Sequence, residues 1–589
     1  MKKLAKRITG KEWGMILLTV LFTCFSVYLE LEVPTYISEI TELIGTPGTE
    51  LGQLWSPAAK MMGLSLLAFL SSVTVGFFAS RVAASYTTHL RRDIFNRVLD
   101  FSQTEIKRFS IPSLLTRTTN DITQVQMLFT MGLQVVTRGP IMAIWAIGKI
   151  LGKSEYWLWA VVVAVIVNVL MTTVLITLAF PKQSVIQKLT DKLNSITRES
   201  LTGIRVVRAY NAEDYQDKKF EEANDEVTRL NLFVNRLMAI MNPIMMAISS
   251  GLTLAIYWIG AYIINDASLA ERLPLFSDMV VFMSYAMQVV MGFLLMGALF
   301  IVLPRTLVSA GRINQVLDLH SSIENPSHAQ TADPSVQGQV EFRDVTFRYS
   351  KNSEAVVEHV TFKAEAGQTV AFIGSTGSGK STLVNLLPRF YDVSAGEILV
   401  DGVNVQDYDL VDLHNKVGYI PQKAVLFSGD VKDNLDFGKS KETPLGEAAM
   451  WQALELAQSK NFIEDKEAGL ASEVAQGGTN FSGGQRQRLA IARALARKPE
   501  ILIFDDSFSA LDYKTDRILR QELAEKTKSM TKLIVAQRIS TIMDADLILV
   551  LDQGKVVGQG THKELLATNE VYQEIAYSQL SKEELEHGK

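Results

Sequence analysis

The sequence predicts a multi-domain chain: an all-α transmembrane domain of six helices over residues 1–320, a linker over 321–338 and an α/β domain over 339–589. Three observations support this division. Long uncharged apolar runs are confined to the first 304 residues. Short apolar strands alternate with helical stretches from Val340 onward. The segment between the two regions is polar, contains two prolines and lacks apolar periodicity.

Six segments of the first domain are candidates to cross a lipid bilayer, which requires about 20 residues of apolar helix. Gly14–Leu29 has 16 residues and is long enough if Trp13 and Leu31 lie at the interfaces. Ile122–Ile150 is the weakest candidate, because two basic residues and a proline interrupt it. The other four are uncharged runs of 20 to 29 residues: Met61–Ser80, Tyr156–Phe180, Leu237–Asn265 and Met279–Pro304.

The distribution of charge indicates the orientation and supports the weakest span. Five basic residues precede the first span, whereas Leu29–Ser56 contains five glutamates and no lysine or arginine. The positive-inside rule therefore places the N-terminus in the cytoplasm of a multi-pass protein of the cell membrane. An even number of spans returns the chain to the cytoplasm before the C-terminal domain, and six spans satisfy this only if Ile122–Ile150 is a real span. Two charged stretches, Arg81–Asp121 and Pro181–Arg236, are predicted to extend the spans as cytoplasmic helices that turn and return.

Bulk composition excludes several classes of protein. The chain has 589 residues, 48% hydrophobic and 21% charged, so it is too long for a single core and too apolar for a disordered chain. Its net charge of −5 provides no overall basic field, and we expect no nucleic-acid partner. Cys24 is the only cysteine, which excludes a disulfide framework and a multi-cysteine metal site.

The most specific motif of the second domain is a glycine-rich P-loop between the strand Thr369–Ile373 and a helix. The pattern G-x-x-x-x-G-K-[ST] lets backbone N–H groups surround phosphate oxygens at the start of a helix. Lys380 is expected to reach the β- and γ-phosphates of ATP, and the Ser381 hydroxyl to bind Mg²⁺. The predicted ATP-binding residues of this loop are Gly374, Ser375, Thr376, Gly377, Ser378, Gly379, Lys380, Ser381 and Thr382.

A second motif lies about 125 residues further along the chain, where an apolar strand from Ile501 ends in two carboxylates, Asp505 and Asp506. A carboxylate at the end of such a strand can hold the Mg²⁺ that bridges the β- and γ-phosphate oxygens. Asp505 is therefore predicted to be a Mg²⁺ ligand. Many strands end in aspartate, so this motif indicates a nucleotide site only in combination with the P-loop before it.

A third motif, FSGGQRQRLAIARAL from Phe481 to Leu495, opens an amphipathic helix whose N-terminus suits phosphate. It resembles the ABC signature, and with the other motifs the whole chain resembles a half-transporter of the ABC exporter type. In that family two nucleotide domains meet head to tail, and each ATP lies between the P-loop of one chain and the signature of the other. The resemblance implies that four signature residues act on the partner's ATP: Ser482, Gly483, Gly484 and Gln485.

The resemblance also assigns roles to shorter motifs. Tyr349 matches the aromatic residue that stacks on adenine, and Gln422 matches the glutamine that touches Mg²⁺ and senses the membrane domain. Ser509–Asp512 resembles the D-loop. Phe109–Asp121 and Glu199–Tyr210 resemble the segments around the two coupling helices of exporters.

Two residues depart from the family pattern at predicted catalytic positions. Asp506 stands where the family usually has the glutamate that acts as general base, and its side chain is shorter by one methylene. Loss of a general base typically costs about 10²–10⁴ in rate. Gln537 stands where the family usually has the switch histidine; glutamine can donate a hydrogen bond but cannot protonate.

These two departures beside an intact signature resemble the degenerate-site subunit of heterodimeric bacterial multidrug exporters, the LmrCD kind. That resemblance implies ATP and Mg²⁺ as cofactors, a second half-transporter as partner, and amphipathic or hydrophobic small molecules as substrates in a lipid bilayer. Two alternatives stay open: a homodimeric lipid or peptide exporter that tolerates Asp506, and an ATP-gated membrane regulator.

Features of the spans leave the substrate open. Met279, Met283, Met287 and Met291 recur every four residues. Such a stripe suits varied apolar substrates, and it equally suits ordinary helix packing. Arg138 is either an intramembrane site residue or a residue just below the membrane.

Overall fold

The computed structural model describes residues 2–438 and 444–580, so the last residues of the predicted second domain lie outside the described part. The chain forms two compact units. A helical unit contains Met1–Leu99 and Ile111–Leu319, and a sheet unit contains Asp100–Ser110 and His320–Lys589. The short segment Asp100–Ser110 thus belongs with the sheet unit although the helical unit surrounds it in sequence.

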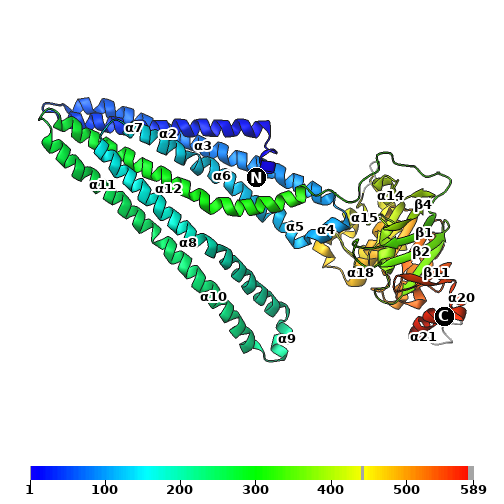
Figure 1. Cartoon of the computed structure of the whole chain (residues 1–589). Helices are drawn as coiled ribbons and strands as arrows, with labels where there is room; N and C mark the ends of the chain where they lie inside the picture. Colours follow the sequence, from blue (N-terminus) through cyan, green and yellow to red (C-terminus); the bar gives the residue numbers. More distant parts are fainter. Residues whose placement is uncertain (1, 439–443, 581–589) are drawn as a thin grey trace. The chain divides into compact units, whose positions relative to one another are not determined.

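Helices build the whole of the described helical unit (Figure 1). Their bounds are α1 Lys2–Ala5, α2 Gly10–Gly45, α3 Leu51–Leu99, α5 Ile111–Thr118, α6 Asn120–Met131, the π-helix η1 Gly132–Val136, α7 Arg138–Ile150, α8 Glu155–Thr202, α9 Ile204–Ala209, α10 Glu213–Ala239, α11 Met241–Asp266 and α12 Arg272–Leu317. Within the described residues, six segments are long and apolar enough to cross a membrane, which confirms the predicted six spans: Gly10–Gly45, Leu51–Leu99, Ile111–Ile150, Glu155–Ala179, Glu213–Asp266 and Arg272–Met296.

The weakest predicted span is real and carries a local irregularity. The π-helix Gly132–Val136 interrupts it, with the N–H of Thr137 donating to the carbonyl of Gly132 at 3.1 Å. Pro140 then lies in the first turn of α7, where its missing N–H is best tolerated. A π-turn widens the helix and is found disproportionately at functional sites. Pro140 is thus accommodated at the start of α7, and the two basic residues pair with glutamates of α2, Arg138 with Glu30 and Lys149 with Glu32.

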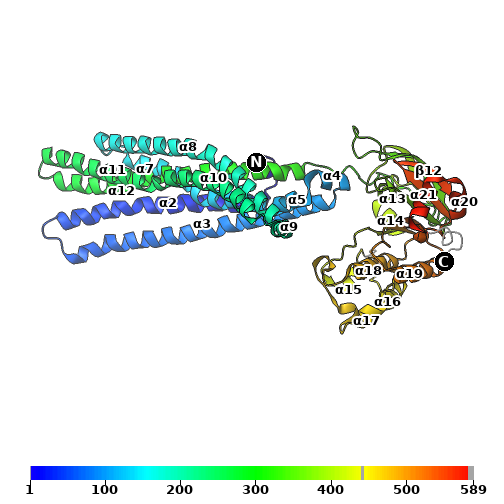
Figure 2. The ribbon, with the colours of Figure 1, turned by 90° about the horizontal axis from the view of Figure 1, so that it is seen from below.

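The long polar stretches between spans are helical, as predicted. α8 continues to Thr202, turns through the short helix α9 and returns as α10, beside which it runs (Figure 1). The other stretch, Arg81–Asp121, continues α3 to Leu99, passes through two short helices and returns as α6, which lies against α3. α2 and α3 also lie side by side along most of their length (Figure 2). The stretch Glu199–Tyr210, predicted to resemble a coupling segment, forms the turn between α8 and α10.

The described residues of the sheet unit form three sheets. The antiparallel sheet has the order β2-β1-β4-β5, and the larger sheet has the order β12-β11-β3-β10-β9-β6, in which all neighbours are parallel except β12. A short antiparallel pair, β7 and β8, is the third. The strands are β1 Val340–Phe347, β2 Val357–Ala364, β3 Thr369–Gly374, β4 Ala395–Val400, β5 Val403–Asn404, β6 Val417–Ile420, β7 Gly429–Asp430, β8 Glu473–Val474, β9 Ile501–Asp505, β10 Thr531–Val535, β11 Leu547–Asp552 and β12 Lys555–Gly560.

Both faces of the parallel strands are buried, and this explains their continuous apolar runs. Leu502 and Phe504 face one hydrophobic core, whereas Ile501 and Ile503 of the same strand face the other. The helices of this unit are α4 Gln103–Phe109, α13 Lys380–Leu386, α14 Leu410–Lys416, α15 Val431–Leu435, α16 Glu447–Leu456, α17 Lys460–Glu464, α18 Gly483–Ala496, α19 Tyr513–Lys526, α20 His562–Thr568 and α21 Glu570–Gln579, with 3-10 turns η2 Gly469–Ala471, η3 Gln476–Gly478 and η4 Ile539–Thr541.

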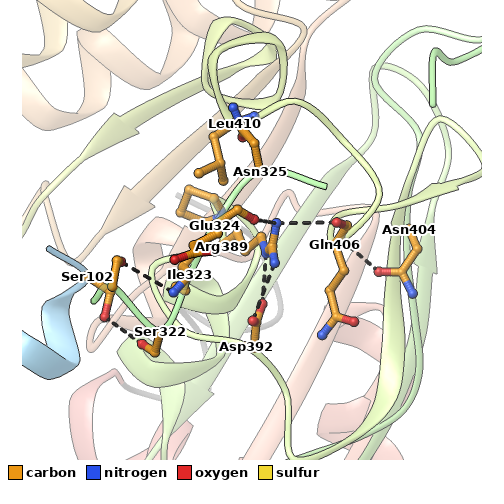
Figure 3. A network of polar contacts seen from close by, with 12 residues as sticks. Ser102, Ser322, Ile323, Glu324, Asn325, Arg389, Asp392, Asn404, Gln406 and Leu410 are labelled. Carbon is orange, nitrogen blue, oxygen red and sulfur yellow. Dashed lines mark hydrogen bonds and ion pairs between the residues drawn. The ribbon is translucent and has the colours of Figure 1, made fainter. Parts of the chain in front are cut away.

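The predicted linker has no helix or strand, yet it is bound along the sheet unit (Figure 3). The side chain of Asn325 donates to Asp409 at 2.8 Å and accepts from the backbone N–H of Leu410 at 2.9 Å. The buried guanidinium of Arg389 donates to the carbonyl of Glu324 at 3.3 Å. These contacts hold the linker against the sheet unit, so it is bound in place although it has no helix or strand.

Candidate functional site

The predicted nucleotide-binding residues converge at one edge of the larger sheet. Because β3, β6, β9 and β10 are parallel, their carboxyl ends meet at the same edge, and the loops that follow them surround one space. That space is a cavity of about 350 Å³. Its lining comes from five separate stretches of sequence: Val356, Thr376, Gly377, Gly379, Lys380, Ser381, Thr382, Gln422, Asp506, Val535 and Gln537.

The P-loop has the backbone that its glycines permit. Gly379 has a φ of 94°, and a Cβ there would lie 2.6 Å from the carbonyl oxygen of Val356, so a side chain would clash with the backbone. The Lys380 ammonium donates to the carbonyls of Gly374 at 2.8 Å and Ser375 at 2.7 Å. These acceptors are neutral, and burial lowers the pKa of Lys380. An entering phosphate would supply the negative charge that this ammonium lacks in its immediate contacts.

Two of the three residues predicted to contact Mg²⁺, Ser381 and Asp505, lie against each other, whereas the Gln422 amide donates to Asp506. The Ser381 hydroxyl donates to Oδ1 of Asp505 at 2.6 Å, and the hydroxyl of Tyr419 lies 3.4 Å from Oδ2. Burial raises the pKa of Asp505, which means that the site favours neutralisation of this carboxylate. A hydroxyl and a single carboxylate, completed by phosphate oxygens and water, are the donor set that Mg²⁺ prefers. The residues present therefore fit a Mg²⁺–nucleotide complex.

The two residues that depart from the family pattern contact each other directly. The side-chain amide of Gln537 donates to Oδ2 of Asp506 at 2.7 Å, and the amide of Gln422 donates to the same oxygen at 2.9 Å. Asp506 is buried and has a positive φ of 50°, and burial raises the pKa of its carboxyl group. One carboxylate oxygen at the predicted base position is thus already engaged by two N–H donors.

The predicted signature lies apart from this cavity, because none of its four residues lines it. Ser482 caps α18: its hydroxyl accepts from the N–H of Gln485 at 3.3 Å, and the Gln485 side chain accepts from the N–H of Ser482 at 3.0 Å. Ser482 and Gly483 are exposed, so the N-terminus of α18 is accessible to another molecule.

Family models match both parts of the chain. The ABC transporter transmembrane region matches residues 16–293, and the ABC transporter domain matches residues 357–509. An uncharacterized ABC transporter ATP-binding protein of Mycobacterium tuberculosis is 37% identical over 565 residues, with 96% of this chain and 95% of that protein covered. The chain belongs to the ABC transporter family. It has the half-transporter layout of ABC exporters, with a membrane domain fused to an ATPase domain that binds ATP with Mg²⁺ and powers transport.

Other relatives of this ABC exporter also cover most of the chain. An uncharacterized ABC transporter ATP-binding protein of Bacillus subtilis is 33% identical, covering 94% of each chain. An ATP-dependent lipid A-core flippase of Pseudomonas aeruginosa is 33% identical, covering 85% of this chain and 81% of that protein. The structure of a bacterial Atm1-family ABC exporter with ATP bound shares the fold, with a TM-score of 0.80 at 23% identity over 97% of this chain and 99% of that one.

Two residues beside Tyr349, at the predicted adenine position, belong to none of the ABC motifs: Lys107 and Tyr391. The Lys107 ammonium lies 4.5 Å from the ring centre of Tyr349 and 5.2 Å from that of Tyr391. Hydrogen bonding to Tyr391 raises the pKa of Lys107. Tyr349 also shares a 2.9 Å hydrogen bond with Thr382 of the P-loop. Lys107 comes from α4, far away in sequence, and no local motif marks a single lysine as part of a nucleotide site.

Proposed function

We propose that this chain is one half of a heterodimeric exporter that expels amphipathic or hydrophobic small molecules from a bacterial cell. It lies in the cell membrane, with its N-terminus and ATPase domain in the cytoplasm. In this proposal the chain's own P-loop binds ATP but hydrolyses it slowly. Its signature completes a faster catalytic site on the P-loop of a different subunit.

The observation that carries the proposal is the engagement of Asp506. A general base must accept a proton from water at about 2.6–3.2 Å. Oδ2 of Asp506 already accepts from Gln422 and Gln537, and its side chain is shorter than glutamate. A histidine at position 537 could carry a proton near the γ-phosphate, whereas Gln537 contributes only another amide donor. The signature at the start of α18 has the family's sequence and is exposed, which supports its use by a partner's ATP.

A cavity in the helical unit supports an amphipathic substrate. It has a volume of about 420 Å³ and lies within the predicted apolar runs, beside the π-helix. Thr23, Ser26, Ser72, Val75, Gly76, Gln134, Val135, Arg138, Met142, Met291 and Leu295 line it. This mixture of hydroxyl groups, methionines and one cation suits a molecule with a polar end and an apolar body. Met279, from the same methionine stripe, is instead buried in the helical core, so the stripe serves both packing and the cavity.

A homodimeric lipid exporter is the second candidate. It is favoured by the relatives named ATP-dependent lipid A-core flippase, whereas Arg138 at the cavity does not distinguish the two candidates. The guanidinium of Arg138 donates to both carboxylate oxygens of Glu30 at 2.6 Å, which balances its charge. A lipid headgroup and an amphipathic drug would both fit such a cavity.

The two candidates differ in what the chain does alone. In lipid bilayers, the purified chain is expected to bind Mg²⁺–ATP and to hydrolyse it about 10²–10⁴-fold more slowly than the complete heterodimer, because a compromised general base costs that much. Steady-state ATP turnover, with the oligomeric state measured in the same sample, checks this. Vigorous turnover by a stable homodimer would overturn the heterodimer and favour the lipid exporter.

Filling the cavity is expected to impair substrate binding without impairing ATP use. Met291→Trp adds a bulky indole to the cavity wall, and we expect at least about a tenfold rise in the concentration of an amphipathic fluorescent dye that half-saturates transport. Transport of the dye into inverted vesicles is the measurement, with basal ATP turnover of the heterodimer in parallel. Met62→Trp, at an exposed methionine of α3 that is not part of the cavity lining, is the matched control. Equal effects of the two variants would contradict the assignment of the cavity.

A further inference from the structure

The last helix of the described chain contacts the loop that carries Gln537. α21 ends at Gln579, whose side-chain amide lies across the backbone after β10. Its Nε2 donates to the carbonyl oxygen of Gln537 at 2.8 Å, and its Oε1 accepts from the N–H of Ile539 at 2.9 Å. One side chain therefore satisfies a backbone acceptor and a backbone donor on either side of Arg538.

α21, which carries Gln579 at its end, lies beside α20 (Figure 1) and is packed and hydrogen-bonded to the rest of the sheet unit. Tyr572 and Ala576 are completely buried, and the Tyr572 hydroxyl lies 2.6 Å from Nδ1 of His562. Asn569 caps the helix by accepting from the N–H of Tyr572 at 2.8 Å. The side chain of Gln573 also donates to the carbonyl of Leu566 at 2.8 Å.

The loop that Gln579 contacts is anchored at its two ends but exposed between them. The N–H of Ala536 donates to Phe372 of β3 at 3.1 Å, and Ile539 is completely buried. Gln537 and Arg538 are exposed. The direction of the Gln537 side chain, which donates to Asp506 at 2.7 Å, depends on how the intervening backbone is held. Among the described residues, the Gln579 amide is the side chain that bonds this stretch of backbone on both sides.

We propose that Gln579 is a positioning residue of the nucleotide site. It orients the loop after β10, residues 536–539, which we call the switch loop, so that Gln537 faces Asp506 and bound ATP. It contacts no reacting atom and acts through Gln537. The inference rests on the proposed function in one respect, the contact of Gln537 with bound ATP. It holds whether the site hydrolyses quickly or slowly, because it concerns how tightly the loop closes over nucleotide.

The test measures nucleotide release from the full-length chain in lipid bilayers. A fluorescent ATP analogue with Mg²⁺ is bound, and its dissociation is followed after addition of excess ATP. Gln579→Ala is expected to accelerate release about threefold to tenfold, since two neutral hydrogen bonds that hold the loop are lost. Gln579→Glu is expected to behave similarly, because a carboxylate cannot donate to the carbonyl of Gln537. Gln573→Ala removes one side chain–backbone bond between α21 and α20. It should change release less than about twofold, because Tyr572, Ala576 and the Asn569 cap still hold the helix and Gln579 keeps both of its bonds.

A double-mutant cycle separates positioning from general stabilisation. If Gln579 acts through Gln537, the pair Gln537→Ala with Gln579→Ala should release nucleotide no faster than Gln537→Ala alone. Additive effects, or a lower melting temperature in Gln579→Ala with unchanged release, would overturn the inference. If Gln537→Ala itself left release unchanged, the assignment of Gln537 in the proposed function would fail, and this inference with it. An effect of Gln537→Ala without an effect of Gln579→Ala would refute the inference alone.

Discussion

Replacing Ser482 by alanine is expected to lower ATP turnover of the assembled heterodimer by about 10²-fold, whereas Lys380→Ala should lower it by less than about threefold. Ser482 lies at the exposed start of α18 and, in the proposed function, faces the γ-phosphate on the partner's catalytic site. Removal of one preorganised donor from a site of developing charge typically costs about 10²–10³ in rate. Lys380 lines this chain's own cavity, which contributes little hydrolysis in the proposed function.

The measurement is steady-state ATP turnover of the heterodimer, together with dye transport. Because Ser482→Ala also removes a helix cap, a control must lose a cap of the same kind elsewhere. Thr561→Ala is suitable, since Thr561 and Glu564 form an equivalent capping box at the start of α20. The control should retain nearly full turnover. Comparable losses in Ser482→Ala and Lys380→Ala would show that the two ATP sites contribute equally, which is opposite to the proposed asymmetry.

The second large expected effect is a gain in the rate of ATP hydrolysis. Asp506→Glu combined with Gln537→His is expected to raise hydrolysis at this chain's own site by about 10²–10⁴, the contribution of a general base. The geometry explains why both changes are needed. Glutamate alone would restore the reach of the carboxylate but leave the Gln537 amide as its donor, and histidine alone would leave the carboxylate short.

Site-resolved hydrolysis checks this gain. The heterodimer is made with Ser482→Ala in this chain, which lowers turnover at the partner's site by about 10²-fold. The same heterodimer with Lys380→Ala added gives the residual turnover of the partner's site, and the difference between the two reports on the chain's own P-loop. Gln537→Asn with Asp506→Glu is the control, because asparagine keeps an amide in place of an imidazole. Unchanged turnover in the double variant would mean that features other than these two residues limit the site.

Local sequence motifs predicted most of the fold. The strand–loop–helix context of the P-loop, the buried strand that ends at Asp505 and the helix that opens at the signature all lie within short stretches, and the structure confirms each of them. The six spans were predictable for the same reason, because length and apolar composition suffice to define a membrane helix. The weakest span was ambiguous because no local sequence pattern predicts a π-helix. Whether one forms beside Arg138 and Pro140 also depends on the helices that pack around them.

The sequence by itself determined the class of this protein, the ATP motifs and the two residues that depart from the family pattern. Only the tertiary structure decided that Gln422 and Gln537 donate to the same oxygen of Asp506, that Lys107 covers Tyr349, and that Gln579 holds the switch loop. The physical reason is distance along the chain. Helices, strands and phosphate loops arise from neighbouring residues, whereas these contacts join segments separated by tens to hundreds of residues. Gln422, Asp506 and Gln537 meet because parallel strands of a particular order bring their carboxyl ends to one edge of a sheet. Lys107 and Gln579 reach their partners because the helices α4 and α21 pack within the same unit.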